Sequence, residues 1–559
     1  MVRTVVTRLV PYLDRFIDFV LVLLLVFTPL AFGSVEDWAQ AAAHFLITLV
    51  LAAWVLKVAW GPAPLIMSLG WRGDPEKARL GRSRRPPRAG LFGGRVLLSG
   101  IEIPALLFAL VVGAQTVPIP QRWLAAISPM TMDIVKNSFP QEEGSGPLTV
   151  RRLEDWLLHR PAASASASGS GPTRVSGSAA SLLPDAPLLG GARPRARISL
   201  SPAATRRQLG IFLGYLAVFL VGINQWRDRR HASRIIVTLA VLGGLVSLFG
   251  ILQKLTWNGK IYWLRPPSQG GTPFGPFVNQ NHFAGYLEML LPVTVGLMAT
   301  LAVRARQGAD PTVRLLDRGE TFIPRLILLA AAGLSAGLAI LICRSRGALL
   351  SILLAAGLFL LISGSGRGRW KTLLGGLLCA GLAAGLIWRI GGGEAWSRYA
   401  SLVDPAAEPS FAFRLDTARR TLALARDFPF MGVGLGAFPV IYPLYAPGGR
   451  VNRTGAAHND LAQLAAETGA VGTVLALAGL ALFLKRFLLP GLRRAGSAHR
   501  HTIHGLAVGF LAMLIHSLFD FNLQIYSNGL LFVVLGALLA SDGLSRIPAP
   551  AGEPAGPVA

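Results

Sequence analysis

A histidine and a polar stripe stand together in the stretch GAAHNDLAQLAAETG, residues 455–469. Asn459, Gln463 and Glu467 are spaced by four residues and begin directly after His458, so a helix would align them on one face. An imidazole titrates near neutral pH and can therefore accept the proton of an attacking hydroxyl. The pattern favours proton transfer at His458, with the stripe orienting the imidazole or binding a polar substrate.

A structural alternative accounts for part of the same stretch. Asp460 can cap a helix, and Gln463 three residues later completes a capping-box arrangement. This explanation does not extend to Glu467, which lies roughly 10 Å further along the helix. A carboxylate at that depth in an apolar span needs a partner or a water-filled cavity.

An arginine pair occupies a short turn between two apolar runs in CRSRGALLS, residues 343–351. The planar guanidinium presents a fixed pair of donors that matches phosphate oxygens, so Arg344 and Arg346 suit a lipid diphosphate. The alternative is that both arginines end a helix and extend towards lipid headgroups.

A second histidine opens another apolar run in NQNH, residues 279–282. Asn281 and His282 are candidate binding residues, and Glu288 lies further along the same run. Asparagine is also a common helix cap, so a purely structural role for Asn279 and Asn281 stays open.

Two further groups of polar residues carry weaker signals. Arg414 begins a basic amphipathic stretch, FRLDTARRTLALAR, which alternatively faces anionic lipid headgroups. His516 and Asp520 lie one helical turn apart, and we expect them to satisfy each other inside a helical bundle. The glycines of GVGLG, residues 432–436, do not indicate a nucleotide loop, because no strand, turn and helix surround them.

The composition decides what must position these residues. The 559-residue chain is 52% hydrophobic and 15% charged with a mean hydropathy of +0.51, which excludes an ordinary soluble domain. Apolar runs predict an all-α integral membrane protein with about twelve spans. The spans are expected at 16–32, 40–59, 100–117, 208–225, 235–253, 282–302, 325–343, 347–363, 372–389, 461–484, 503–519 and 526–541.

The positive charge of the chain is a topology signal. Its formal net charge is +26, but the basic residues fall mostly in short segments between apolar runs, so we expect no nucleic-acid partner. If these segments are cytoplasmic, both termini are cytoplasmic and the stretches with His458 and Arg346 face the other side. The two cysteines, Cys343 and Cys379, form no zinc or haem spacing, and we expect no metal, cofactor or disulfide.

The segments between the spans differ in composition. The middle of 118–207 is rich in Ser, Ala, Gly and Pro and is expected to be a disordered insert without chemistry. The aromatic-rich segment 390–460 is expected to fold before the tenth span. The resulting division comprises N-terminal spans 1–117, the long loop 118–207, core spans 208–389, the large outer loop 390–460, C-terminal spans 461–541 and the tail 542–559.

The order of these motifs resembles the O-antigen ligase and polymerase family of bacterial inner-membrane glycosyltransferases. Asn-x-Asn-His opens one span, Ser-Arg-Gly opens another, and a large loop ends in His-Asn-Asp-Leu with a downstream Glu-x-Gly. The terminal HSLFDFNLQIYSNGLLF is similar to the last part of the same family, and the resemblance covers about 205–541.

The resemblance implies a fold of the glycosyltransferase C type and transfer of a glycan from undecaprenyl diphosphate at the periplasmic face. The matching functional positions are His458, Arg346 and Arg414. The implied partners are the undecaprenyl-diphosphate-linked donor, the bilayer, and a lipid A core or growing polysaccharide acceptor. Polysaccharide export or chain-length proteins are further candidates.

Several functions share these motifs. A ligase, a polymerase and a protein O-oligosaccharyltransferase differ in the acceptor, which the sequence does not distinguish. A multi-span transporter or flippase of a lipid-linked or anionic substrate is the alternative from another class. A transporter would place its ionisable residues near the bilayer midplane in two related halves, whereas here they gather at one face without an internal repeat.

Overall fold

The structure is a computed structural model of the 559-residue chain. It describes residues 2–60, 66–69, 95–138, 197–267, 272–307, 319–362, 409–446, 454–493 and 499–544. The expected disordered insert and the expected span 372–389 lie outside these ranges.

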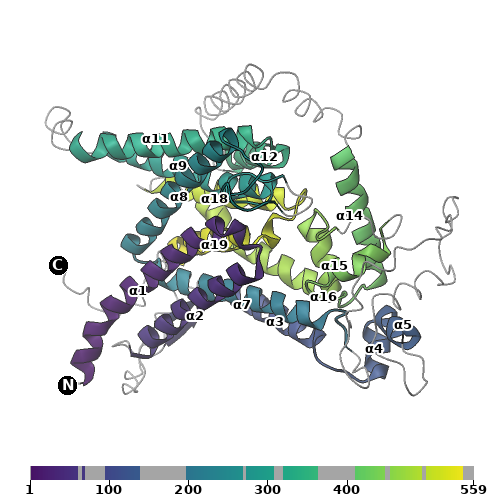
Figure 1. The fold of residues 1–559 in the computed structure, drawn as a ribbon. Coiled ribbons are helices and arrows are strands. Elements are labelled where there is room, and N and C mark those ends of the chain that lie inside the picture. The colour runs from purple at the N-terminus through teal and green to yellow at the C-terminus, as the bar shows by residue number, and fades with distance from the viewer. Residues whose placement is uncertain are drawn as a thin grey trace. The chain divides into compact units, whose positions relative to one another are not determined.

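The described part is mostly helical (Figure 1). Its N-terminal elements are α1 (Val2–Leu30), η1 (Phe32–Ser34), α2 (Asp37–Trp60), β1 (Ile66–Leu69), β2 (Arg95–Leu98), α3 (Glu102–Gln115), α4 (Gln121–Ile127), α5 (Pro129–Ser138), α7 (Pro202–Gln225) and α8 (Arg229–Leu255). The remaining elements are α9 (Gln280–Gln307), α11 (Gly319–Ile342), α12 (Arg346–Ile362), α14 (Pro409–Asp427), α15 (Phe438–Ile441), η4 (Tyr442–Leu444), α16 (Asp460–Phe483), η5 (Leu484–Leu488), α17 (Leu489–Leu492), α18 (Arg500–His516), η6 (Asn522–Gln524) and α19 (Tyr526–Leu544).

The apolar runs form helices as their length predicts. Every expected span within the described ranges overlaps one of these helices. Among the described residues, 6 helices are long and apolar enough to cross a membrane, namely α2, α7, α8, α9, α11 and the helix that begins at Asp460. Shorter apolar helices are α3, α12 and α19. The arrangement of twelve spans stays a prediction.

The contacts divide the chain into two compact units. Unit 1 comprises residues 1–105, 213–412 and 478–559. Within it α9 contacts α8, α11, α12, α18 and α19, while α1 contacts α2 and α8 (Figure 1). Gly505 and Gly509 let α18 approach the backbone of α9, because a Cβ at either position would collide with the carbonyl of Pro292 or Met289.

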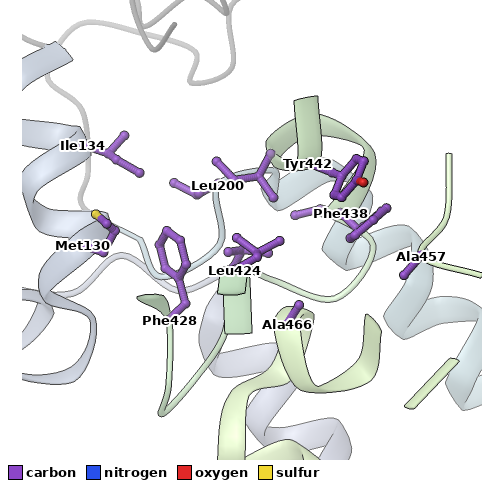
Figure 2. Close-up of a cluster of buried hydrophobic side chains, with 12 residues drawn as sticks. Met130, Ile134, Leu200, Leu424, Phe428, Phe438, Tyr442, Ala457 and Ala466 are labelled. Carbon is purple, nitrogen blue, oxygen red and sulfur yellow. The ribbon is translucent and has the colours of Figure 1, made fainter. Parts of the chain in front are cut away.

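Unit 2 comprises residues 106–212 and 413–477. Its core collects buried apolar side chains from α5, from the segment before α7, from α14 and the loop after it, from α15 and η4, and from the start of α16 and the residues before it (Figure 2). The cluster consists of Met130, Ile134, Leu200, Leu424, Phe428, Val433, Ala437, Phe438, Ile441, Tyr442, Ala457 and Ala466. The aromatic-rich segment is therefore folded over the described residues 409–446, and residues near both ends of the 118–207 segment contribute to the same core.

Candidate active site

The helix α16 is broken at Gly469, inside the predicted tenth span. Gly469 has φ 62° and ψ −166°, which interrupts the helical hydrogen bonds. A break of this kind in an apolar span requires other partners for the freed amide and carbonyl groups. The conformation requires glycine, both because of its positive φ and because a Cβ there would collide with the backbone of Phe430.

The loop that follows α14 supplies these partners. The amides of Ala470 and Val471 donate to the carbonyls of Pro429 (2.7 Å) and Phe430 (3.2 Å). In the other direction, the amide of Val433 donates to the carbonyl of Ala466 at 3.0 Å. The loop thus fills the break in the helix and holds the residues before Gly469 in place.

Gln115, the last residue of α3, completes the same arrangement. Its Nε2 donates to the carbonyls of Met431 (2.6 Å) and Glu467 (2.9 Å), and its Oε1 accepts from the amide of Leu435 (3.1 Å). Gln115 is fully buried. A buried amide side chain that makes hydrogen bonds through both ends fixes the loop and the broken helix relative to each other.

The carboxylate of Glu467 is buried and accepts hydrogen bonds from the chain itself. The amide of Gly436 donates to Oε2 at 2.8 Å, and the amide of Phe438 donates to Oε1 at 3.2 Å. Nε2 of Gln463 donates to Oε1 at 3.1 Å. The predicted polar stripe therefore exists, and the partner that Glu467 needs is the glycine-rich loop 432–438.

The start of α16 is capped by Asn459 one residue earlier than the sequence predicted. Oδ1 of Asn459 accepts from the amide of Ala462 at 2.8 Å, which is the N-cap hydrogen bond, so the expected cap at Asp460 is corrected. Oε1 of Gln463 reaches back to the amide of Ala457 at 2.8 Å. Both contacts order the chain immediately around His458.

His458 stands at this ordered start in an uncommon backbone conformation. Its φ is +51°, in the left-handed region that non-glycine residues seldom adopt. The side chain is half-buried, and its ring meets that of Phe413 edge to face at a centroid distance of 6.0 Å. A left-handed backbone conformation persists where the neighbouring residues are fixed. Here Ala457, before His458, is buried in the core of unit 2, and Asn459, after it, caps α16.

Arg414 lies on α14 beside Phe413 and is half-buried. In the middle of the same helix, Nε of Arg420 donates to Asp416 at 2.7 Å and its Nη1 donates to the carbonyl of Tyr445 at 3.0 Å. Arg414, His458, Asn459, Gln463 and Glu467 therefore all belong to unit 2.

Arg344 and Arg346 belong to unit 1, so their proximity to His458 stays a prediction. Arg344 has φ +56° in the turn between α11 and α12, and Arg346 is the first residue of α12. Ser345 between them is buried, while both arginines are half-buried. The expected short turn is therefore present.

Asn281 and His282 also belong to unit 1 and enter a polar cluster near the start of α9. Nδ2 of Asn281 donates to Oδ2 of Asp520 at 3.1 Å. Nδ1 of His282 lies 3.0 Å from Oδ1 of Asn522, and Nδ2 of Asn528 donates to the carbonyl of His282 at 3.0 Å. His282 is buried by these contacts.

His516 contacts a carboxylate that its sequence spacing did not indicate. Its Nδ1 lies 2.9 Å from Oε2 of Glu288, whereas we expected mutual satisfaction with Asp520. Among the described residues, no group of three or more His, Cys, Asp and Glu side chains is arranged to hold a metal ion.

Comparison with known families bears on this arrangement. Residues 330–477 match the family model described as O-antigen ligase. This match supports assignment to the O-antigen ligase/polymerase family. The resemblance that the motifs indicated is thereby confirmed. No curated protein matches the chain.

The match to the O-antigen ligase family covers the arginine turn, α14 and the His458 stretch, whereas Asn281 and His282 precede it. The family acts in membrane glycan ligation or polymerisation. Together with the long apolar helices, it makes the chain a multi-pass membrane protein.

Sequence reasoning missed two residues of the candidate site in unit 2. Gln115 carried a usable signal, because a lone glutamine at the end of an apolar run needs a partner. Phe413 carried none, since it is one of several aromatic residues in the segment 390–460 and its contact with His458 depends on tertiary packing.

Proposed function

We propose that the chain is a membrane glycosyltransferase that moves a glycan from undecaprenyl diphosphate to an acceptor hydroxyl. The observation that carries the proposal is the placement of His458 within the O-antigen ligase family match, held in a left-handed conformation by ordered neighbours. Strained residues of this kind concentrate at active sites, because the surrounding structure must maintain them.

In the proposed reaction, His458 accepts or orients the proton of the acceptor hydroxyl. The acceptor oxygen forms a bond to the anomeric carbon of the donor while the bond from that carbon to the diphosphate oxygen breaks. The electron pair leaves with undecaprenyl diphosphate, and direct displacement inverts the anomeric centre.

Arginines stabilise the departing diphosphate in this proposal. Arg346 and Arg414, helped by Arg344, supply positive charge and paired donors where negative charge develops. These arginines take the part that a metal ion plays in other transferases, which makes the proposed reaction independent of metal. Asn281 and His282 are proposed to bind substrate from the start of α9.

The polar stripe has a positioning role. Glu467 accepts hydrogen bonds from the amide of Gly436 and from the side chain of Gln463, and Gln463 also accepts from the amide of Ala457, so the two residues hold loop 432–438 and the start of α16 in place. Asn459 fixes the backbone directly after His458. We propose that these three residues orient His458 rather than supply a separate group to the reaction.

The proposed setting is the bacterial inner membrane, with both termini cytoplasmic and the active site facing the periplasm. The proposed fold is of the glycosyltransferase C type. The donor is an undecaprenyl-diphosphate-linked glycan, and the acceptor is a lipid A core or a growing polysaccharide.

A transfer assay tests the proposal. Purified protein in proteoliposomes receives one undecaprenyl-diphosphate repeat unit, with and without a lipid A core acceptor, and products are resolved by size. A ladder from repeat units alone indicates a polymerase, and transfer only to the core indicates a ligase. Absence of any product with several donors would contradict the enzyme and favour transport of a lipid-linked substrate.

The proposed base has its own test. His458→Asn keeps a residue that tolerates the left-handed conformation but removes a group that can take up a proton. We expect transfer to fall by about 100-fold or more, within the range of general-base catalysis, while the protein stays in the membrane at its normal level. Transfer at the wild-type rate in this variant would exclude His458 as the base.

A further inference from the structure

A buried carboxylate and a buried imidazole in unit 1 have no part in the reaction described above. Glu288 on α9 and His516 at the end of α18 are both fully buried. Nδ1 of His516 lies 3.0 Å from Oε1 and 2.9 Å from Oε2 of Glu288. Burying two ionisable side chains inside a span costs free energy, so such a pair points to a structural or functional role.

The other edge of the imidazole faces the start of α12. A Cβ built on Gly347 would lie 2.5 Å from Nε2 and 3.0 Å from Cδ2 of His516, closer than real Cβ atoms approach. The ring of His516 therefore packs directly on the backbone at Gly347. Only glycine leaves room for this contact, which explains why a residue that weakens helices stands in the first turn of α12.

Gly347 directly follows Arg346, the first residue of α12. The turn that precedes it is held in a definite shape, because Arg344 adopts φ +56° and Ser345 is buried. The backbone directly after Arg346 is thus packed against His516, and the hydrogen bond to Glu288 holds the imidazole of His516.

The three helices that make this arrangement contact one another directly. Helix α9 packs against both α12 and α18, and α12 packs against α18. One turn beyond His516, the amide of Asp520 donates to the carbonyl of His516 at 3.0 Å, and the Asp520 carboxylate accepts a hydrogen bond from Asn281, the second residue of α9. The pair therefore links α9 and α18 directly, and it contacts α12 through the close approach of His516 to Gly347.

We propose that Glu288 and His516 are positioning residues that set the Arg344–Gly347 turn, and thereby Arg346, for binding the diphosphate of the donor. This inference rests on the proposed function, because it assumes that Arg346 binds a diphosphate. Neither Glu288 nor His516 touches substrate in this arrangement. They act through the close contact between the imidazole and Gly347.

A matched pair of glycine substitutions on one helix tests the contact. Gly347→Ala introduces a methyl group where His516 stands, whereas Gly357→Ala introduces one into open space. Alanine favours a helix at both positions, so a loss confined to the first variant arises from the contact. A displacement of about 1 Å at a positioning group lowers rates by about 100-fold, so we expect kcat/KM for the donor to fall by about that factor in Gly347→Ala.

The kinetic pattern separates positioning from general damage. We expect the KM for the lipid-diphosphate donor to rise in Gly347→Ala while the KM for the acceptor stays at the wild-type value. Gly357→Ala should match wild type in both. Equal changes in the two KM values, or wild-type behaviour of Gly347→Ala, would overturn the inference.

Variants of the pair supply a second line of evidence. Glu288→Gln keeps an oxygen that accepts from His516, whereas Glu288→Leu keeps the volume without an acceptor. We expect Glu288→Gln to keep the KM for the donor near the wild-type value. Glu288→Leu should raise that KM, while the amount of protein in the membrane stays the same. If both behave like wild type, Glu288 does not position the turn.

Binding of the carrier alone distinguishes failure of this inference from failure of the proposed function. The affinity for undecaprenyl diphosphate in detergent micelles is measured for wild type, Gly347→Ala and Gly357→Ala. If Gly347→Ala is the only variant that binds the carrier more weakly, the positioning role is supported. This holds even if the wild-type protein transfers no glycan, because absence of transfer contradicts only the proposed reaction. Equal binding by all three overturns the positioning role, and no binding by wild type overturns both.

Discussion

Removal of the Glu467 carboxylate tests the role of the glycine-rich loop most directly. Glu467→Ala leaves three donors without their acceptor, namely the amides of Gly436 and Phe438 and the side-chain amide of Gln463. Because all three surround a buried carboxylate, the loop 432–438 should open far more often while the rest of unit 2 stays folded.

The magnitude follows from the hydrogen bonds that are lost. Each hydrogen bond to a charged group contributes about 1.5–3 kcal/mol, and the burial of the carboxylate opposes part of that stabilisation. We therefore expect the free energy of local opening to fall by about 3 kcal/mol in Glu467→Ala, which is about a 100-fold change in the opening equilibrium. Glu467→Gln keeps one accepting oxygen, and we expect about half of that loss.

Hydrogen exchange read by mass spectrometry measures this opening in the peptide that covers the loop. Val474→Ala is the matched control, because its side chain lies on the same helix and is 63% exposed. Exchange in the control should equal that of wild type. If Glu467→Ala abolishes glycan transfer while loop exchange is unchanged, Glu467 acts on the substrate and the positioning role is wrong.

Three other substitutions probe the same unit. Phe413→Leu removes the ring that contacts the proposed base, and because aromatic pairs contribute about 0.5–1.5 kcal/mol, kcat should fall by about 2- to 12-fold. Transfer kinetics measure the change, with substitution of the exposed Phe430 by leucine as the control. Equal effects of the two substitutions would refute a role for the contact between Phe413 and His458. Asn459→Ala removes the helix cap and should lower the free energy of unfolding by about 1 kcal/mol, with recovery in Asn459→Asp, as read from denaturant melts in detergent. Gly434→Ala forces a side chain into φ +106° against Ser199 and should destabilise by at least about 1–2 kcal/mol, whereas Gly455→Ala, which meets open space, should be neutral in the same melts.

The sequence was sufficient for features that depend on local pattern. Runs of about 20 apolar residues predict the helices, because a bilayer fixes their length. The four-residue spacing placed Gln463 and Glu467 on one helix face, and in the structure Nε2 of Gln463 donates to Oε1 of Glu467 at 3.1 Å. The family resemblance followed from the order of short motifs and did not depend on tertiary structure.

Features that depend on contacts across long sequence intervals were not predictable. Gln115 and Glu467 are 352 residues apart, so nothing in the local pattern of either indicates their hydrogen bond. The same holds for Glu288 and His516, which are 228 residues apart. The helix break at Gly469 was missed because a single glycine within an apolar run is common, and the hydrogen bonds that stabilise the break come from the loop 429–434 and from Gln115.

The discontinuous make-up of unit 2 also sets the order of events while the chain is being synthesised. Gln115 emerges 352 residues before Glu467. At a synthesis rate of about 5–20 residues per second, the N-terminal part of unit 2 waits roughly 20–70 s for the residues that it pairs with. Helices α3, α4 and α5 must therefore persist in the nascent chain without their core. His458, the proposed base, becomes ordered only after the helices of unit 1 up to α12 have been made.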